Sequence, residues 1–179
     1  MKILKKILIV ILIIIAIPLV IALFVKKDYA VQREVVINKP KQPVFDYIKY
    51  LKNQDNYAIW NQMDPAMQKD YKGTDGEPGF SYSWKSAKEE VGQGEQVIKT
   101  VTPGESMETT IHFIKPFEGL ATARLSTTAV NDNQTKVTWS FSSGMKYPMN
   151  FLLLFMDMDK MLGKDLEQGL ANLKGVLEK

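Results

Sequence analysis

Residues 135–177 read TKVTWSFSSGMKYPMNFLLLFMDMDKMLGKDLEQGLANLKGVL, and the spacing of the apolar residues changes within this stretch. Val137, Trp139 and Phe141 alternate with polar residues, which is the period of a strand with one buried face. Beyond Pro148 the apolar residues recur every three or four positions, which predicts one long helix with a single apolar side. That apolar stripe consists of Phe155, Met158, Leu162, Leu166, Leu170, Leu173 and Leu177.

The segments before this stretch predict more strands and little helix. Alternating apolar residues are separated by short turns rich in glycine, proline and asparagine, which leave no room for a helical crossover, so successive strands pair antiparallel. Helical spacing occurs earlier only between Pro43 and about Tyr57. The order is strand, two short helices, about six strands and one long helix, an α+β arrangement. The predicted earlier strands are Tyr29–Asn38, Met67–Lys72, Phe80–Lys85, Gly94–Thr102, Met107–Phe113 and Leu120–Ala129.

Several short motifs accompany this order of elements. They are Pro40 with Pro43–Ile48, Trp60 with Asp64-Pro65, Gly79–Trp84 with Val91–Gly94, Thr135–Trp139, and Met161–Leu166. In this order they resemble the START-like superfamily called SRPBCC, and in particular its polyketide cyclase-like bacterial members, over residues 29–179. The resemblance implies a helix-grip fold, in which a curved antiparallel sheet wraps around the long C-terminal helix and a ligand cavity lies between them. Lipid binders, cyclases and chaperone-associated domains share this fold, so the fold does not select an activity.

The N-terminal region is typical of a membrane anchor. Residues 7–25 are apolar throughout and, as a helix, span close to the roughly 30 Å hydrocarbon core of a bilayer. A cleaved signal peptide is the alternative, but its apolar region is usually about 7–15 residues, and here Lys26-Lys27 closes the run. We therefore predict a single-pass anchor over residues 1–28 and a START-like domain over residues 29–179. Lys2, Lys5 and Lys6 favour a domain outside the cytoplasm, although the lysines after the run oppose this orientation.

Composition narrows the function. The net charge of +3 resides in the lysines that flank the apolar run, and the remaining chain is close to neutral, which argues against nucleic-acid binding. The chain has no cysteine, and its only histidine, His112, falls on the polar side of a strand, so we expect neither a metal site nor a cofactor nor a catalytic triad. Glu95, Glu108 and Arg124 lie on predicted strands; a carboxylate pointing inward there would suit a general base, whereas an outward one would be solvated.

We expect aromatic and methionine side chains to line the cavity that the resemblance implies. The alternative is that these side chains simply fill the core, although the flexible thioether of methionine suits a variable ligand. The candidate ligand-binding residues are Trp60, Phe80, Tyr82, Trp84, Phe113, Trp139, Phe141, Met149, Leu152 and Met156.

Three functions remain open from the sequence. The first is a membrane-tethered binding protein for a hydrophobic small molecule or lipid-like ligand. The second is a polyketide cyclase- or dehydratase-like enzyme on the same scaffold, and the third is an interaction module with a filled core. The sequence favours binding over catalysis and does not identify the ligand or any protein partner. A wholly apolar cavity would favour the first function and convergent polar groups inside it the second.

We predict that a chain lacking residues 1–28 folds and stays soluble, because the strands and the long helix beyond this segment complete the fold on their own. A cooperative thermal melt and a monodisperse gel-filtration profile of the truncated chain would be the measurements. An aggregated or unfolded product would contradict the predicted domain boundary.

Overall fold

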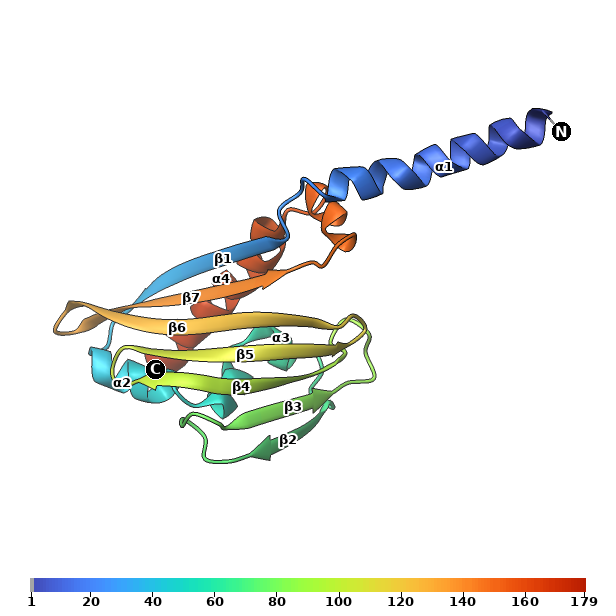
Figure 1. Ribbon diagram of the computed structural model, residues 1–179. Helices are drawn as coiled ribbons and strands as arrows, with labels where there is room; N and C mark the ends of the chain where they lie inside the picture. The colour runs from blue at the N-terminus through green and yellow to red at the C-terminus, as the bar shows by residue number, and fades with distance from the viewer. Residues whose placement is uncertain (1) are drawn as a thin grey trace.

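Seven antiparallel strands form one sheet in the order β1-β7-β6-β5-β4-β3-β2 (Figure 1). The computed structural model describes residues 2–179. Only β1 and β7 are neighbours that are distant in sequence; all other neighbours are consecutive, so short turns connect them. The predicted helix-grip α+β fold is confirmed. The strands are β1 (Asp28–Ile37), β2 (Gln68–Lys72), β3 (Ser81–Lys85), β4 (Gln93–Thr102), β5 (Ser106–Lys115), β6 (Gly119–Asn131) and β7 (Gln134–Gly144).

Strand register gives the sheet two distinct ends. Asp28 at the start of β1 pairs with Gly144 at the end of β7, and Lys115 at the end of β5 pairs with Gln93 at the start of β4. We call this the anchor end, after the predicted anchor α1 (Lys2–Ala22), which leads into β1 here. The β3–β4 and β5–β6 loops lie at the same end. The far end carries the β6–β7 and β4–β5 turns. Figure 1 shows α1 projecting beyond the anchor end.

The long helix α4 (Met158–Leu177) covers the inner face of the sheet and packs mainly along β1. Its side chains Leu166, Leu170 and Leu173 are at most 1% exposed, as the apolar stripe predicts. Gly169 brings the helix against the ring of Trp139, since a Cβ there would lie 2.9 Å from a ring carbon. This close contact fixes how near the helix approaches the sheet.

Arg33 ties the first turn of α4 to β1. It shares the apolar side of its strand, and its guanidinium donates two hydrogen bonds, of 2.9 and 3.0 Å, to the carboxylate of Asp159. Gly163 leaves the space that the guanidinium occupies, because a Cβ there would overlap Arg33. The hydrogen bond from Arg33 holds the pKa of the Asp159 carboxyl below its usual value. Arg33 therefore keeps its charge solvated at the edge of the core while it positions the helix.

Three short helices follow β1 along the chain: α2 (Lys41–Ile48), the 3₁₀ helix η1 (Leu51–Asn56) and α3 (Ile59–Gln62). Val44, Phe45 and Ile48 are buried, in agreement with the predicted helical spacing. The carboxylate of Asp75 accepts hydrogen bonds from the backbone N–H groups of Leu51 (2.8 Å) and Lys52 (3.1 Å) and so satisfies free donors at the start of η1. The β2–β3 loop thereby holds the start of η1 in place.

At the anchor end, α1 packs against the 3₁₀ helix η2 (Met149–Leu154). Asn150 is fully buried, and its Nδ2 donates to the carbonyl oxygens of Ala22 (2.7 Å) and Val25 (3.0 Å). Because the last carbonyls of a helix lack intrahelical partners, Asn150 acts as a cap for α1. Within the described residues, one helix, Ile3–Ala22, is long and apolar enough to cross a membrane, although a signal sequence has the same properties. The predicted apolar helix is present, and its role stays a prediction.

The long helix begins later than the sequence analysis predicted. Residues 149–154 form η2, and α4 starts after Asp157, whose carboxylate accepts a hydrogen bond of 2.9 Å from the backbone N–H of Lys160. Aspartate is a favoured N-cap residue, so the sequence did contain a signal for this start. Phe155 consequently lies outside the helical stripe and is 73% exposed.

We expect Leu166→Ala to lower the free energy of unfolding by about 2–5 kcal/mol, because it opens a void in a fully packed region. Lys164→Ala, on the exposed side of the same helix, should change it by no more than about 0.5 kcal/mol. Urea unfolding monitored by circular dichroism measures both changes. Equal losses in the two variants would contradict the packing described for α4.

Candidate ligand cavity

A cavity of about 290 Å³ lies between the inner face of the sheet and the short helices, towards the anchor end. This volume is at the lower limit of the about 300–1,000 Å³ typical of small-molecule sites. The interior is therefore not completely filled by side chains. The lining residues are Gln54, Trp60, Asn61, Met63, Met67, Tyr82, Trp84, Glu90, Val91, Gln96, Ile111, Phe113, Lys115, Pro116, Phe117, Ala123, Trp139, Phe141 and Leu162.

Aromatic rings build most of the wall and hold one another in place. Trp84 stacks on Tyr82 with ring centroids 5.7 Å apart and meets Phe113 edge to face at 6.1 Å. Its Nε1 donates to the carbonyl oxygen of Val91 at 3.1 Å, and its ring lies over Gly94 on the neighbouring strand, where a Cβ would overlap it. Because each ring is fixed by a neighbour, the wall is preformed rather than shaped by a ligand.

The polar groups deep in the cavity are side-chain amides. Gln96 is 7% exposed, and its Nε2 donates to Oγ1 of Thr109 at 2.9 Å, while this hydroxyl donates to the carbonyl oxygen of Ala123 at 3.3 Å. Gln54 and Asn61 add two further amides to the lining. Amides donate and accept hydrogen bonds but do not titrate at ordinary pH, so they suit orientation of a polar group rather than proton transfer.

Ionisable groups lie at the edge of the cavity or are held neutral. Glu90 and Lys115 line its outer part and are exposed. Tyr82 is buried, its hydroxyl lies 3.9 Å from the sulfur of Met67, and burial raises the pKa of this phenol above its usual value. Desolvation disfavours the phenolate, so Tyr82 can donate a hydrogen bond but does not act as a base near neutral pH.

The strand charges considered as candidate bases point away from the cavity. Glu95, Glu108 and Arg124 each occupy the outer face, because their immediate neighbours along the strands are the buried residues. His112 is also on this face, with its Nε2 3.3 Å from a carboxylate oxygen of Glu118. The alternation of the strands thus excludes all four from the interior, and the inward alternative for the carboxylates is wrong.

The mouth of the cavity is held by contacts between the β3–β4 loop and the end of α3. The hydroxyl of Ser86 donates to Asp64, and Nζ of Lys88 donates to the carbonyl oxygen of Met63 at 2.8 Å. Asp64 also accepts from the backbone N–H of Ala66 at 3.1 Å, as the predicted turn requires. The Ser86 hydrogen bond is the main reason that the pKa of Asp64 lies below its usual value. These contacts fix one side of the opening.

The structure brings together most of the predicted ligand-binding residues. Phe80 precedes β3 by one residue and therefore lies nearer the far end of the sheet. It is buried there against Tyr71 and does not line the cavity. Met149 and Leu152 lie on η2, which packs against α1, and Met156 follows η2 and lies near Phe24 and Val25. None of the three lines the cavity, so their assignment to its wall is wrong. The predicted residues that do line the cavity are Trp60, Tyr82, Trp84, Phe113, Trp139 and Phe141, and their contact with a ligand stays a prediction.

Some lining residues were missed by the sequence analysis. Gln96, Ile111 and Ala123 lie on the inward side of predicted strands, so alternation carried a signal for them. Leu162 belongs to the predicted helical stripe, but the stripe does not indicate which of its members border a cavity. Asn61 gives no such signal, because a four-residue helix has no readable period.

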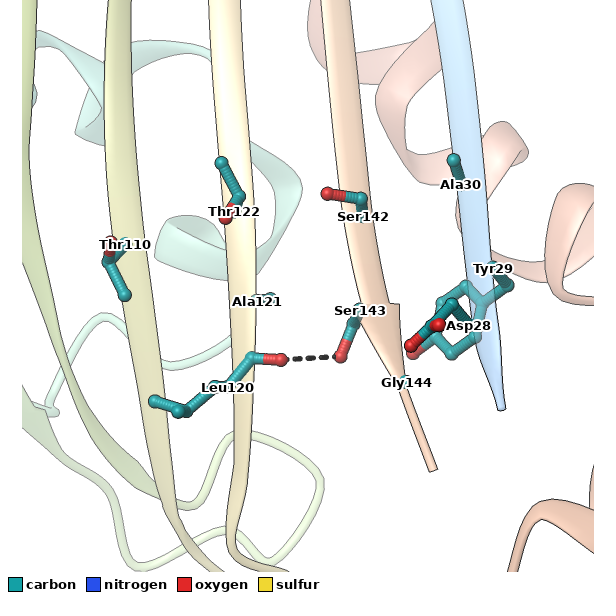
Figure 2. A pocket seen from close by; sticks show the side chains of 10 residues that line it. All are labelled: Asp28, Tyr29, Ala30, Thr110, Leu120, Ala121, Thr122, Ser142, Ser143 and Gly144. Carbon is teal, nitrogen blue, oxygen red and sulfur yellow. Dashed lines mark hydrogen bonds between the residues drawn. The ribbon is translucent and has the colours of Figure 1, made fainter. Parts of the chain in front are cut away.

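A second hollow lies on the outer face of the sheet, and Figure 2 shows its side chains. Ala30, Ser142, Thr122 and Thr110 form one cross-strand row over β1, β7, β6 and β5. These short side chains leave a shallow, open depression, beside which Ser143 donates a hydrogen bond of 2.8 Å to the carbonyl oxygen of Leu120. An open hollow excludes little water, so the more enclosed inner cavity is the better candidate site.

The fold and the inner cavity together define a helix-grip protein with a ligand-binding or polyketide cyclase-like scaffold. The sequence family described as polyketide cyclase / dehydrase and lipid transport matches residues 29–178, and the chain belongs to this family. No match is found among curated protein sequences.

Solved structures of the same fold are similar to this chain at low sequence identity. A protein from Nitrosospira multiformis is 15% identical, with a TM-score of 0.58, over 82% of this chain and 94% of its own. Norcoclaurine synthase from Thalictrum flavum, solved as a point mutant with a transition-state analogue, is 7% identical, with a TM-score of 0.59, over 85% of this chain and 97% of its own. Ara h 8.0201 is 14% identical, with a TM-score of 0.56, over 83% of this chain and 97% of its own. At these identities the likeness establishes the fold alone.

We expect Leu162→Ala to reduce stability less than Leu166→Ala does, below about 2 kcal/mol, because it enlarges an existing cavity instead of opening a new one. The affinity of the Leu162→Ala variant for the apolar fluorophore aminoanthracene should change by at least about threefold, whereas Leu166→Ala should leave this affinity unchanged. Fluorescence titration and thermal melts of the two variants provide the comparison. Similar stability losses with no change in binding would mean that Leu162 is ordinary core.

Proposed function

We propose that this protein is a membrane-tethered binding protein that holds a small apolar molecule in the cavity between sheet and helices. The observation that carries the proposal is the composition of the deep lining, which consists of preformed aromatic walls and non-titrating amides. Such a lining excludes water and leaves a few polar groups to orient a ligand, which is the usual design of a small-molecule site. The amides of Gln96, Gln54 and Asn61 favour a ligand with one polar end, such as a carbonyl or hydroxyl group.

The cyclase- or dehydratase-like alternative requires a group that removes a proton from the substrate. Among the lining residues described by the structure, Glu90 and Lys115 are exposed and the phenol of Tyr82 is kept protonated. A base of raised pKa in a closed site is what such chemistry ordinarily uses. The deep lining offers none, so binding is favoured over turnover.

Contacts between α1 and the domain support a retained anchor. Ala22 is fully buried, and Asn150 is buried while it caps the end of α1. Cleavage after the apolar run would detach Ala22 from the domain and remove both hydrogen-bond acceptors of Asn150, the carbonyl oxygens of Ala22 and Val25, which costs free energy for a buried amide. On this proposal α1 spans the bilayer once, and Lys5 and Lys6 keep the N-terminus in the cytoplasm, so that the domain lies outside it.

The proposal is tested by filling the cavity. We expect Ala123→Phe to weaken aminoanthracene binding at least about tenfold, because the added ring occupies the space between β6 and α3, at a stability cost of about 1–3 kcal/mol. Ala30→Phe, the same substitution on the exposed outer face, should leave binding unchanged. Native mass spectrometry of the full chain, purified from membranes, should show a co-purifying small molecule that Ala123→Phe lacks. Equal binding by the two variants would refute a ligand site in this cavity.

A further inference from the structure

Exposed apolar side chains surround the point where α1 meets the domain. Phe24 is 84% exposed and Phe155 is 73% exposed, and both lie beside the contact between α1 and η2. We call this set the apolar collar: Leu23, Phe24, Met149, Leu152, Leu154 and Phe155. The two hydrogen bonds from the buried Asn150 to the end of α1 fix the collar to the helix. The collar is therefore fixed relative to α1 and lies level with its last turn along the helix axis.

The neighbouring helix indicates what covers the collar. From Ile3 to Ile21 the side chains of α1 are exposed, except for the partly buried Pro18, and would contact lipid in a bilayer. Because the collar adjoins the last turn of that helix, it falls at the boundary between hydrocarbon and headgroups, where apolar side chains of surface-lying segments insert. Lys26, Lys27 and Lys146 are exposed nearby and can reach headgroup phosphates. Asp28 and Asp157 are also exposed there, so apolar burial contributes more than charge.

The mouth of the cavity lies at the same end of the sheet. Its rim includes Phe117 on the β5–β6 loop, which is 80% exposed, and Met63 after α3. Strand register places the loop of Phe117 at the same end of the sheet as the start of β1, with β6 and β7 between them. Met63 joins this end through the β3–β4 loop, where Nζ of Lys88 donates a hydrogen bond to its carbonyl oxygen. The turns of the far end are polar, and Val130 is the nearest exposed large apolar residue to the β6–β7 turn. The exposed large apolar side chains are thus concentrated at the anchor end, where the mouth of the cavity also lies.

We infer that the apolar collar and the Phe117 loop seat the domain on the bilayer surface with the cavity mouth against the lipid. The ligand is then a membrane-resident apolar molecule that enters from the bilayer without crossing water. This inference rests on the proposed membrane tethering and adds to it the orientation of the domain and the source of the ligand. A single anchor helix alone would allow the domain to stand away from the membrane.

Site-directed spin labelling of the full chain in phosphatidylcholine nanodiscs tests the orientation. Since the natural chain has no cysteine, Phe24→Cys, Phe117→Cys, Phe155→Cys and Val130→Cys each give one nitroxide position. Accessibility to oxygen relative to a water-soluble nickel chelate reports depth. We expect lipid-like values at the first three positions and an aqueous value at Val130.

The outcomes separate the two proposals. An aqueous value at Phe117 and Phe155 with a lipid-like value at Phe24 would overturn the seated orientation and leave the tethering intact. An aqueous value at Phe24 would refute the membrane anchor itself. Thermal melts of the labelled variants confirm that each has folded.

The source of the ligand is tested by kinetics. The double variant Leu154→Asp/Phe155→Asp should load aminoanthracene dissolved in the nanodisc lipid about tenfold more slowly, while its equilibrium affinity stays unchanged because the collar is outside the cavity. Val130→Asp, a matched change at the far end, should load at the natural rate. An unchanged loading rate in the double variant would show that the ligand does not enter through the lipid-facing mouth.

Discussion

The contact between α4 and the inner face of the sheet controls the rest of this structure. A seven-stranded sheet needs its apolar face covered, and one helix is too narrow to cover all of it. Because α4 packs mainly along β1, with Gly169 pressed against Trp139, it leaves the inner surfaces of β3 to β6 to the short helices. At the anchor end α3 contains only residues 59–62, and the volume it does not fill is the cavity. The site is thus a consequence of incomplete coverage, stabilised by rings that support one another.

The chemistry of the cavity follows from the alternation of strand side chains. Each charged strand residue that suggested catalysis lies on the outer face, since its neighbours in sequence are needed for the core. Gln96 is a polar side chain that the sheet turns towards the cavity, and Oγ1 of Thr109 accepts a hydrogen bond from its amide. A neutral, orienting group in an apolar volume favours recognition of a ligand over proton transfer. The family description covers both polyketide cyclase / dehydrase and lipid transport. The binding function proposed above corresponds to the second of these.

In the proposed orientation, the difference between the two ends of the sheet connects the cavity to the membrane. Strand register gathers the β3–β4 loop, the β5–β6 loop, η2 and α1 at one end, and the exposed large apolar residues of the domain are concentrated there. Asn150 makes this arrangement rigid, because its amide joins η2 to the last turn of α1. If α1 is the membrane tether that we propose, this rigid joint also determines the direction in which the cavity opens.

The sequence by itself determined the elements and their faces. Alternation in the strands and the stripe of Leu166, Leu170 and Leu173 are local patterns. Each follows from the repeat of the backbone, two residues in a strand and about 3.6 in a helix, which is the same in any tertiary structure. Those patterns predicted the α+β order of elements, and together with the resemblance to the SRPBCC superfamily they predicted the helix-grip fold and most of the aromatic wall. The start of α4 was also encoded, in Asp157, although a continuous apolar run from Phe151 to Met156 obscured it.

Tertiary structure alone decided which apolar residues face empty space and which face other atoms. Leu162 and Leu166 are one turn apart on the same stripe, yet the first borders the cavity and the second is packed, because the element opposite each differs. The same holds for Met149 and Leu152, which have the composition of a cavity wall but are carried to the end of α1 by the break before α4. Periodicity specifies the side of an element that is buried; what that side meets depends on residues distant in the chain.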